Sequence, residues 1–211
     1  MNISHGNILA VFFAAGPAEI EEGLNWYLHA NQVTKRLAKD YDLANNYGTV
    51  AALIAALSPN NKWDKNVRDA EALLKCARHG GDPSGIKVST YGKNKEKAIT
   101  ILNGGDPEEV LGGKKVKAFY DCIIDGDNGD CNSVCVDGHA YSIWLGQRVS
   151  TSSTPTITPK LYDKIAGDYR IATDQINKII GTEKNPSPYR PCDIQAITWI
   201  TWRKLVKGEV K

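Results

Sequence analysis

The sequence predicts an all-α protein, and three features of the chain indicate this class. Apolar residues recur at helical spacing along almost the whole length, strand-like patterns are confined to two short segments (86–90 and 134–136), and Gly, Pro or Ser/Thr clusters separate the helical segments. The 211 residues, of which 42% are hydrophobic and 24% charged, suffice for one core or for two closely packed lobes. This composition is globular rather than disordered.

Three helices are expected in the first part of the chain. An apolar series at helical spacing predicts one amphipathic helix over 18–41. A second helix over 47–57 ends before Pro59, because the residue that precedes a proline avoids the helical conformation. A third helix over 63–77 keeps its apolar residues on one face and ends at a glycine pair, which is a common helix stop.

Six further helices are expected in the second part, where the same spacing recurs. Their ranges are 92–102, 107–111, 115–124, 138–147, 159–180 and 191–206. Two polar segments interrupt them: the turn-rich loop DGDNGDCNS at 125–133 and the Ser/Thr/Pro connector at 150–159.

The cysteines and acidic residues argue against the common metal sites. Five cysteines form no recognisable disulfide framework, and the CxxxC pair of Cys131 and Cys135 has no second pair to complete a zinc site or an iron–sulfur cluster. The acidic loop lacks the ligands of a calcium site, since Gly129 and Val136 stand at its fifth and twelfth positions. We therefore expect no metal, no cofactor, and reduced thiols in a cytoplasmic protein.

The apolar N-terminal segment at 8–16 is not expected to enter a membrane. It has no basic segment before it and is shorter than the roughly 20 apolar residues that span a bilayer. It predicts a buried helix or a strand-like arm.

Lysines cluster in the middle of the chain, although the formal net charge of the whole is only +2. The range 87–117 holds four acidic residues and seven lysines: Lys87, Lys93, Lys95, Lys97, Lys114, Lys115 and Lys117. A basic face of this kind suits a polyanion, and its alternative is a merely solvated surface.

The stretch VCVDGHAYSIWLG at 134–146 places an acid between an apolar run and a mostly apolar helix. If that helix begins at Gly138, Asp137 is its N-cap and accepts backbone N–H bonds at the positive end of the helix dipole. The same position keeps a partly buried carboxylate ionised, as a catalytic group at an oxocarbenium-like centre must be. Both interpretations of Asp137 stay open. His139, in the first turn, suits packing or hydrogen bonding better than general-base catalysis, and we expect it among the residues that bind DNA or substrate.

The stretch VLGGKKVKAFYDCI predicts a helix, a glycine turn and a second helix. Gly112 and Gly113 form the turn, and Lys114, Lys115 and Lys117 lie at the start of the second helix. The turn amides and lysines of such a hairpin can hold a DNA phosphate. Lys117 is then a phosphate ligand or a surface charge or, if it is desolvated, an amine nucleophile.

A polar turn joins the helices expected over 47–57 and 63–77. Asn60, Asn61 and Lys62 lie in this turn, and Trp63 follows it. One interpretation is an interhelical loop with asparagines in turn positions. The other is a short wedge that enters a nucleic-acid duplex where a base has been pulled out, with Trp63 as a stacking residue.

Three stretches in this order, LIAALSPNN, LGGKKVK and VDGHAYSIWLG, resemble the helix-hairpin-helix DNA glycosylases of the endonuclease III and 8-oxoguanine glycosylase superfamily. The resemblance covers residues 47–147. It implies a two-lobed all-α fold over 1–211, one lobe formed by 47–147 and the other by 1–46 plus 148–211, with the active-site cleft between lobes. It also implies a monomer that binds duplex DNA with a flipped base, or single-stranded DNA, and no membrane.

The resemblance assigns roles residue by residue. It implies that Asp137 is the catalytic carboxylate and that Lys117 stands where some members keep a Schiff-base lysine. Asn60 and Asn61 fall on the residues that fill the gap left by the flipped nucleotide.

The chain also departs from the family pattern. Gly112 and Lys115 replace the usual Pro and second Gly of the hairpin, the spacing from Lys117 to Asp137 is two residues longer than in endonuclease III, and the four-cysteine iron–sulfur loop is missing. The compact length and divergent hairpin are similar to phage-encoded branches proposed to process hypermodified thymines.

Three functions are therefore weighed. The first is an N-glycosylase-type enzyme, a hydrolase or lyase, acting on a flipped pyrimidine that can carry a modification. The second is a phage DNA-modifying transferase that substitutes the side group of an activated 5-substituted thymine. The third is a hairpin module that binds DNA without catalysis.

Overall fold

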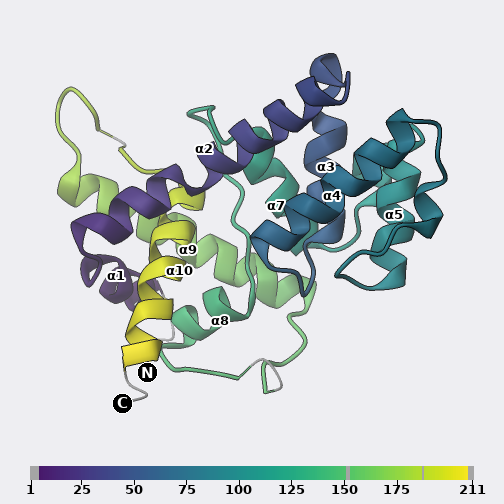
Figure 1. Ribbon diagram of the computed structural model, residues 1–211. Coiled ribbons are helices and arrows are strands. Elements are labelled where there is room, and N and C mark those ends of the chain that lie inside the picture. The colour runs from purple at the N-terminus through teal and green to yellow at the C-terminus, as the bar shows by residue number, and fades with distance from the viewer. Residues whose placement is uncertain (1–4, 151–152, 187, 209–211) are drawn as a thin grey trace. The chain divides into compact units, whose positions relative to one another are not determined.

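The computed structural model describes residues 5–150, 153–186 and 188–208, so that residues 151 and 152 of the expected connector lie outside the described part. The described residues form ten α-helices and two short 3-10 helices, without a strand. In chain order these are α1 (His5–Phe13), α2 (Pro17–Asp40), η1 (Ala44–Asn46), α3 (Tyr47–Leu57), α4 (Trp63–Arg78), η2 (Pro83–Gly85), α5 (Gly92–Leu102), α6 (Pro107–Val110), α7 (Lys114–Ile124), α8 (Gly138–Leu145), α9 (Pro159–Ile180) and α10 (Pro191–Gly208), labelled in part in Figure 1.

The all-α class is confirmed for the described residues. The nine expected helices correspond to α2 through α10, and their ends lie within two residues of the expected ones. The tenth helix is α1, formed by the N-terminal segment for which the sequence allows a helix or a strand-like arm. No helix in the described part of the chain is long and apolar enough to cross a bilayer.

Neither segment with a strand-like pattern forms a strand, in agreement with the all-α class. Within 86–90, the backbone N–H of Ser89 donates to the carboxylate of Asp69 at 2.7 Å. Within 134–136, the hydroxyl of Tyr162 bonds backbone groups at both ends of the segment. Side chains thus satisfy backbone groups that a neighbouring strand would otherwise pair.

The chain divides into two compact units. The hairpin unit comprises His29–Ile124, and the terminal unit comprises Met1–Leu28 together with Asp125–Lys211. The first boundary falls inside α2, which contributes residues to both units. The lobes expected over 47–147 and the remainder of the chain stay a prediction.

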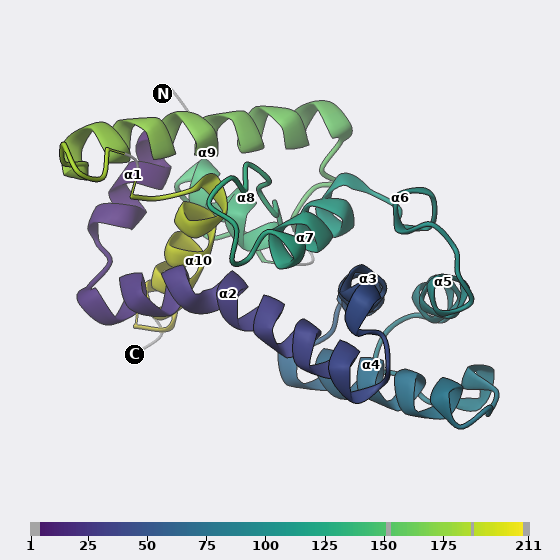
Figure 2. The same cartoon turned by 90° about the horizontal axis from the view of Figure 1, so that it is seen from above.

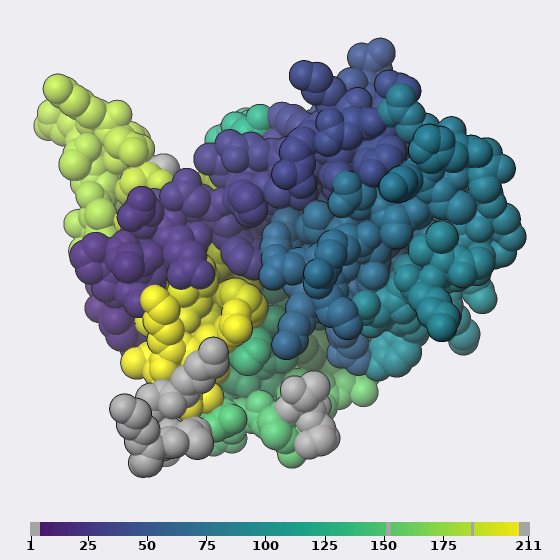
Figure 3. Space-filling model, in the orientation of Figure 1, coloured from purple at the N-terminus to yellow at the C-terminus, as the bar shows by residue number. Residues whose placement is uncertain are grey.

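The core of the hairpin unit is built around α3. The segment 50–57 is buried throughout, because a helix that is apolar on all sides has no face to give to water. Helix α3 packs against α4, α5 and α7, as Figure 2 shows. On the face drawn in Figure 3, residues of α4 and α5 form much of the outer surface of this unit.

The terminal unit is a cluster of α1, α8, α9 and α10 with the first part of α2. Each of α1, α8, α9 and α10 packs against the other three (Figure 1). Helix α2 comes close to α10 at Gly23, where a Cβ atom would lie only 2.6 Å from the Cα of Ile197. This unit holds α8, which carries the acid that the sequence singles out.

Candidate functional site

Asp137 is the N-cap of α8, as the sequence predicts. Its backbone is extended (φ −105°, ψ −173°), and its Oδ1 accepts the backbone N–H of Ala140 at 2.8 Å. The side chain is half-buried. The cap therefore fixes the direction of the carboxylate at the positive end of the helix without removing it from solvent.

The backbone that leads into Asp137 is held by one side chain of α9. The hydroxyl of Tyr162 donates to the carbonyl of Val134 at 2.7 Å and accepts from the N–H of Val136 at 3.3 Å. All three residues are buried. Because Val136 immediately precedes Asp137, this clamp and the cap hold the carboxylate from both sides along the chain.

Removal of the Tyr162 hydroxyl is expected to destabilise the protein. Tyr162→Phe keeps the ring but leaves a buried carbonyl and a buried N–H without this partner, which costs about 1–3 kcal/mol of unfolding free energy. Urea denaturation measures the loss. The control is Tyr189→Phe, which keeps the edge-on ring contact with Phe12 and is expected to change the free energy by less than about 0.5 kcal/mol. If both variants lose the same unfolding free energy, the Tyr162 hydroxyl does not hold the backbone before Asp137 in this way.

A second tyrosine of α9 lies close to Asp137. Tyr169 is fully buried, and its hydroxyl lies 3.4 Å from the hydroxyl of Thr198. Burial raises the pKa of the Tyr169 phenol far above its ordinary value, and the negative charge of Asp137 raises it further. Tyr162 and Tyr169 stand seven residues apart on α9, on one face, and sequence reasoning missed both.

His139 lies at the surface in the first turn of α8. Its ring meets the ring of Trp199 edge-on, with the centroids 6.2 Å apart and the planes at 85°. This is the packing role that the sequence favours for His139. Trp144, in contrast, is buried inside the unit, where its indole N–H donates to Asp168 at 2.7 Å.

The DGDNGDCNS loop is anchored to the terminal unit by Arg190. The guanidinium donates to the backbone carbonyls of Asp125 and Asn128 and pairs with the carboxylate of Asp193, with Nη2 2.8 Å from Oδ1. The hydrogen bond to Asp193 raises the pKa of Arg190 above its ordinary value. Burial raises the pKa of Asp125. The described residues contain no group of three or more His, Cys, Asp or Glu side chains placed to hold a metal ion.

The glycine hairpin lies in the other unit, between α6 and α7. Gly113 has φ +77°, a conformation that glycine adopts without strain. Next to it, a Cβ added to Gly112 would lie 2.5 Å from the ammonium of Lys97, so this lysine of α5 lies against the turn. Lys114 and Lys115 are exposed in the first turn of α7. The turn is thus surrounded by lysines from two helices.

Lys117 is tied to an acidic neighbour. Its ammonium donates to the backbone carbonyl of Glu108 and lies 3.5 Å from a carboxylate oxygen of the same residue. The Lys117 side chain is 39% exposed. Lys117 is therefore a partly exposed cation that already has an acidic partner, and not a side chain enclosed in an apolar pocket.

The polar turn between α3 and α4 presents one asparagine outward. Asn60 is exposed with φ +55°, and its amide donates to the hydroxyl of Tyr91, just before α5. Tyr91 is itself 60% exposed. The turn is braced by a hydrogen bond of 2.8 Å from the Thr90 hydroxyl to the Pro59 carbonyl. The sequence does not single out Tyr91, which only the fold brings beside Asn60.

The other residues of this turn face the protein. Asn61 is half-buried, and its amide donates to Asp69 at 2.9 Å and to the carbonyl of Leu57 at 3.3 Å. Trp63 is partly buried and packs on the core of the hairpin unit, whereas Lys62 is exposed. Asn60 and Lys62 are therefore the exposed members of the expected wedge.

The two groups of expected site residues belong to different units. Asp137 and His139 are in the terminal unit. The hairpin unit holds the remaining ones: Asn60, Asn61, Lys62, Trp63, Gly112, Gly113, Lys114, Lys115 and Lys117. Within the hairpin unit, α5 joins the Asn60 turn to the glycine hairpin, through Tyr91 at its start and Lys97 in its second turn.

Comparison with known proteins identifies one relationship. No curated protein and no solved structure matches the chain. A family model does match, over residues 2–205, and it is described as a family of unknown function (DUF7178). Because the match covers nearly the whole chain, the protein belongs to family DUF7178.

Proposed function

We propose that the protein acts on a base in DNA and has the two-lobed fold of the helix-hairpin-helix glycosylases. One observation carries the proposal: the exposed Asn60 turn and the lysine-lined glycine hairpin lie along the same helix, α5. These segments are about 50 residues apart in the sequence. A fold that brings a polar tip and a phosphate-binding turn together supports binding to a nucleic-acid strand.

The lysines supply the contacts to the DNA backbone. Lys97, Lys114 and Lys115 surround the glycine turn, where the first N–H groups of α7 add the positive end of a helix dipole. Contacts of this kind position a strand without reading its sequence. They also make the affinity fall steeply as salt is added.

Asn60 inserts between the stacked bases of the DNA, in the position that the displaced nucleotide has left. Its left-handed backbone is a conformation that asparagine adopts more readily than most residues other than glycine. Hydrogen bonds to Tyr91 and around Pro59 keep the turn in this conformation before DNA arrives. The exposed ring of Tyr91 offers a face on which a base can stack.

Asp137 supplies the charge at the reacting centre. When the bond between C1′ and the base breaks, the base leaves with the electron pair and the sugar becomes positively charged. A carboxylate held in one direction stabilises that charge, and water then adds to C1′ and releases a proton. The cap from α8 and the Tyr162 clamp provide the fixed direction.

Lys117 acts as a cation rather than as the nucleophile in this proposal. Its side chain is 39% exposed and lies beside Glu108, and a cation at the surface of this kind suits a phosphate ligand. The same observation supports the second candidate function, substitution on the side group of an activated 5-substituted thymine. There Lys117 neutralises a leaving phosphate, and Asp137 accepts the proton of the incoming amine.

Mass spectrometry of nucleosides separates the candidate functions. The protein is incubated with unmodified DNA and with DNA that carries phosphorylated 5-hydroxymethyluracil, each with and without a small polyamine. A free base with an abasic site supports the glycosylase, and a new intact nucleoside supports the transferase. DNA that is bound but chemically unchanged in every mixture leaves only the non-catalytic module.

Borohydride trapping decides the role of Lys117. If Lys117 attacks C1′, reduction during base release joins the protein covalently to the DNA. We expect base release without a trapped adduct, and an adduct that disappears in Lys117→Ala would reverse this assignment.

A further inference from the structure

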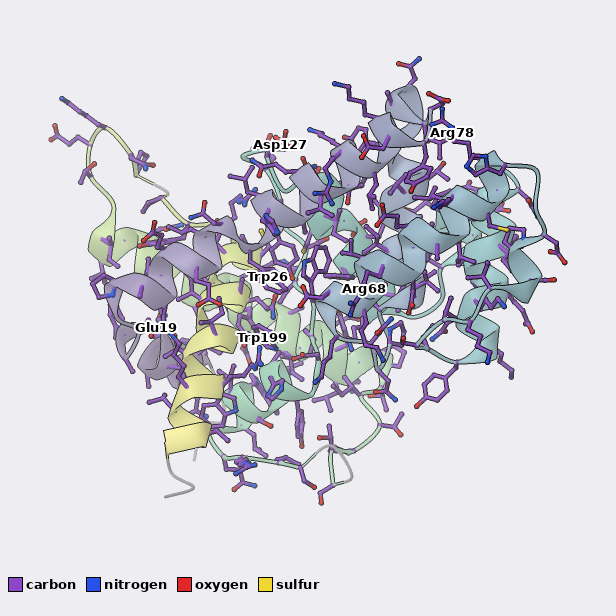
Figure 4. All side chains as sticks on the ribbon, viewed as in Figure 1. Glu19, Trp26, Arg68, Arg78, Asp127 and Trp199 are labelled. Atoms are coloured by element: carbon purple, nitrogen blue, oxygen red, sulfur yellow. The ribbon has the colours of Figure 1, made fainter. Side chains whose placement is uncertain are left out.

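Trp199 of α10 is the centre of a mixed aromatic and cationic cluster in the terminal unit. The guanidinium carbon of Arg203 lies 4.3 Å from the centroid of the Trp199 ring. The centroid of the Trp199 ring lies 5.5 Å from the ring centroid of Trp26 and 6.2 Å from that of His139. Figure 4 shows Trp26 and Trp199, on α2 and α10, near each other. The Arg203-Trp199 cluster, as we call these four residues, includes His139, two residues after Asp137.

Arg203 has no acidic partner within the described part of the chain. It is exposed and forms no ion pair there. The next residue, Lys204, is different, because its ammonium pairs with Glu19 at 2.6 Å. Two adjacent cations of one helix thus differ: one is neutralised by the protein, and the other is held on an aromatic ring.

The stack on Trp199 prepares Arg203 to bind an anion. The Arg203 guanidinium lies over the Trp199 indole. A guanidinium that uses its face for an aromatic contact keeps the N–H groups at its edge for hydrogen bonds. The contact also restricts a long side chain that would otherwise lose rotamer freedom on binding. An edge of parallel N–H donors matches two oxygens of one phosphate.

We propose that Arg203, which lies over the same Trp199 ring that His139 meets edge-on, binds a phosphate of the DNA strand whose sugar faces Asp137. This inference rests on the proposed function. It adds a phosphate contact in the terminal unit to those of the hairpin lysines. A phosphate is favoured over a free carboxylate because a nucleotide presented to Asp137 necessarily carries backbone phosphates next to its sugar. His139 is exposed at the start of α8 and adds a second donor.

The test is the salt dependence of DNA binding, measured with a fluorescent oligonucleotide duplex and with its single strand. Arg203→Ala is expected to weaken binding about 10-fold near physiological salt and to reduce the slope of log affinity against log salt by about one. Trp199→Leu keeps the charge of Arg203 but removes the indole ring on which the guanidinium lies. It is therefore expected to weaken DNA binding less than Arg203→Ala and to leave the salt slope nearly unchanged. Lys204→Ala is the matched control, since this lysine is paired with Glu19, and it is expected to leave both quantities unchanged.

The outcomes separate this inference from the proposed function. If base chemistry is absent and Arg203→Ala still reduces the slope, the phosphate site stands and the enzyme proposal fails. If base chemistry proceeds and Arg203→Ala binds like the wild type, the phosphate site is overturned and the enzyme proposal stands. If Lys204→Ala loses as much DNA affinity and salt slope as Arg203→Ala, the site is overturned, because the loss of any positive charge on this helix then has the same effect. A wild-type protein that binds no DNA overturns both.

Discussion

Asp137→Asn is expected to lower the rate of base chemistry in DNA by at least about 10²–10³-fold while leaving the fold intact. Asparagine caps a helix as well as aspartate, so its side-chain oxygen still accepts the N–H of Ala140. What is lost is the negative charge at the reacting centre, and charge stabilisation of this kind contributes about 3–4 kcal/mol. The rate is measured by nucleoside mass spectrometry, and the fold by the thermal midpoint.

Asp137→Ala separates the cap from the charge. This variant loses both, so it is expected to match the asparagine variant in rate and to lose about 1 kcal/mol of unfolding free energy as well. An asparagine variant that retains near-normal activity excludes catalysis by Asp137. In that case the residue is a helix cap only.

Arg190→Met is expected to cause the largest loss of stability, about 3–5 kcal/mol. The side chains of Arg190 and Asp193 are only 17% and 5% exposed, and the substitution leaves the Asp193 carboxylate buried without its cation. It also removes the hydrogen bonds that the guanidinium donates to the carbonyls of Asp125 and Asn128. Urea denaturation measures the free energy of unfolding, and the midpoint of the transition is expected to fall sharply.

A double variant tests the cause of that loss. Asp193 also accepts the backbone N–H of Arg190 at 2.8 Å, at the start of α10. Asp193→Asn combined with Arg190→Met keeps an acceptor for this N–H and removes the buried charge. The double variant is therefore expected to be more stable than Arg190→Met alone. If the two are equally unstable, the loss comes from the loop contacts and not from the unpaired carboxylate. Lys204→Ala, which breaks an ion pair at the surface, is expected to change the stability far less than Arg190→Met.

The sequence by itself determined the helices α2 through α10, with their ends to within two residues, because the signals for them are local. Pro59 has no backbone N–H to continue α3, which ends two residues before it although Ser58 keeps helical dihedrals, and Asp137 caps α8 through a hydrogen bond that spans three residues. The burial of α3 can be predicted from the sequence as well, since a helix that is apolar on all sides can be placed only in a core. A cap or a stop depends on neighbours along the chain, and these are visible in the sequence.

Only the tertiary structure decided how the side chains of the candidate site are held. Asn61 faces Asp69 while Asn60 faces solvent, although the two residues are identical and adjacent. Lys117 meets Glu108 across the glycine turn, and Tyr162 reaches Val136 from 26 residues away. Trp199 gathers Arg203 and His139 from two helices. These contacts depend on how separate helices pack, and packing is decided by the whole core rather than by any segment.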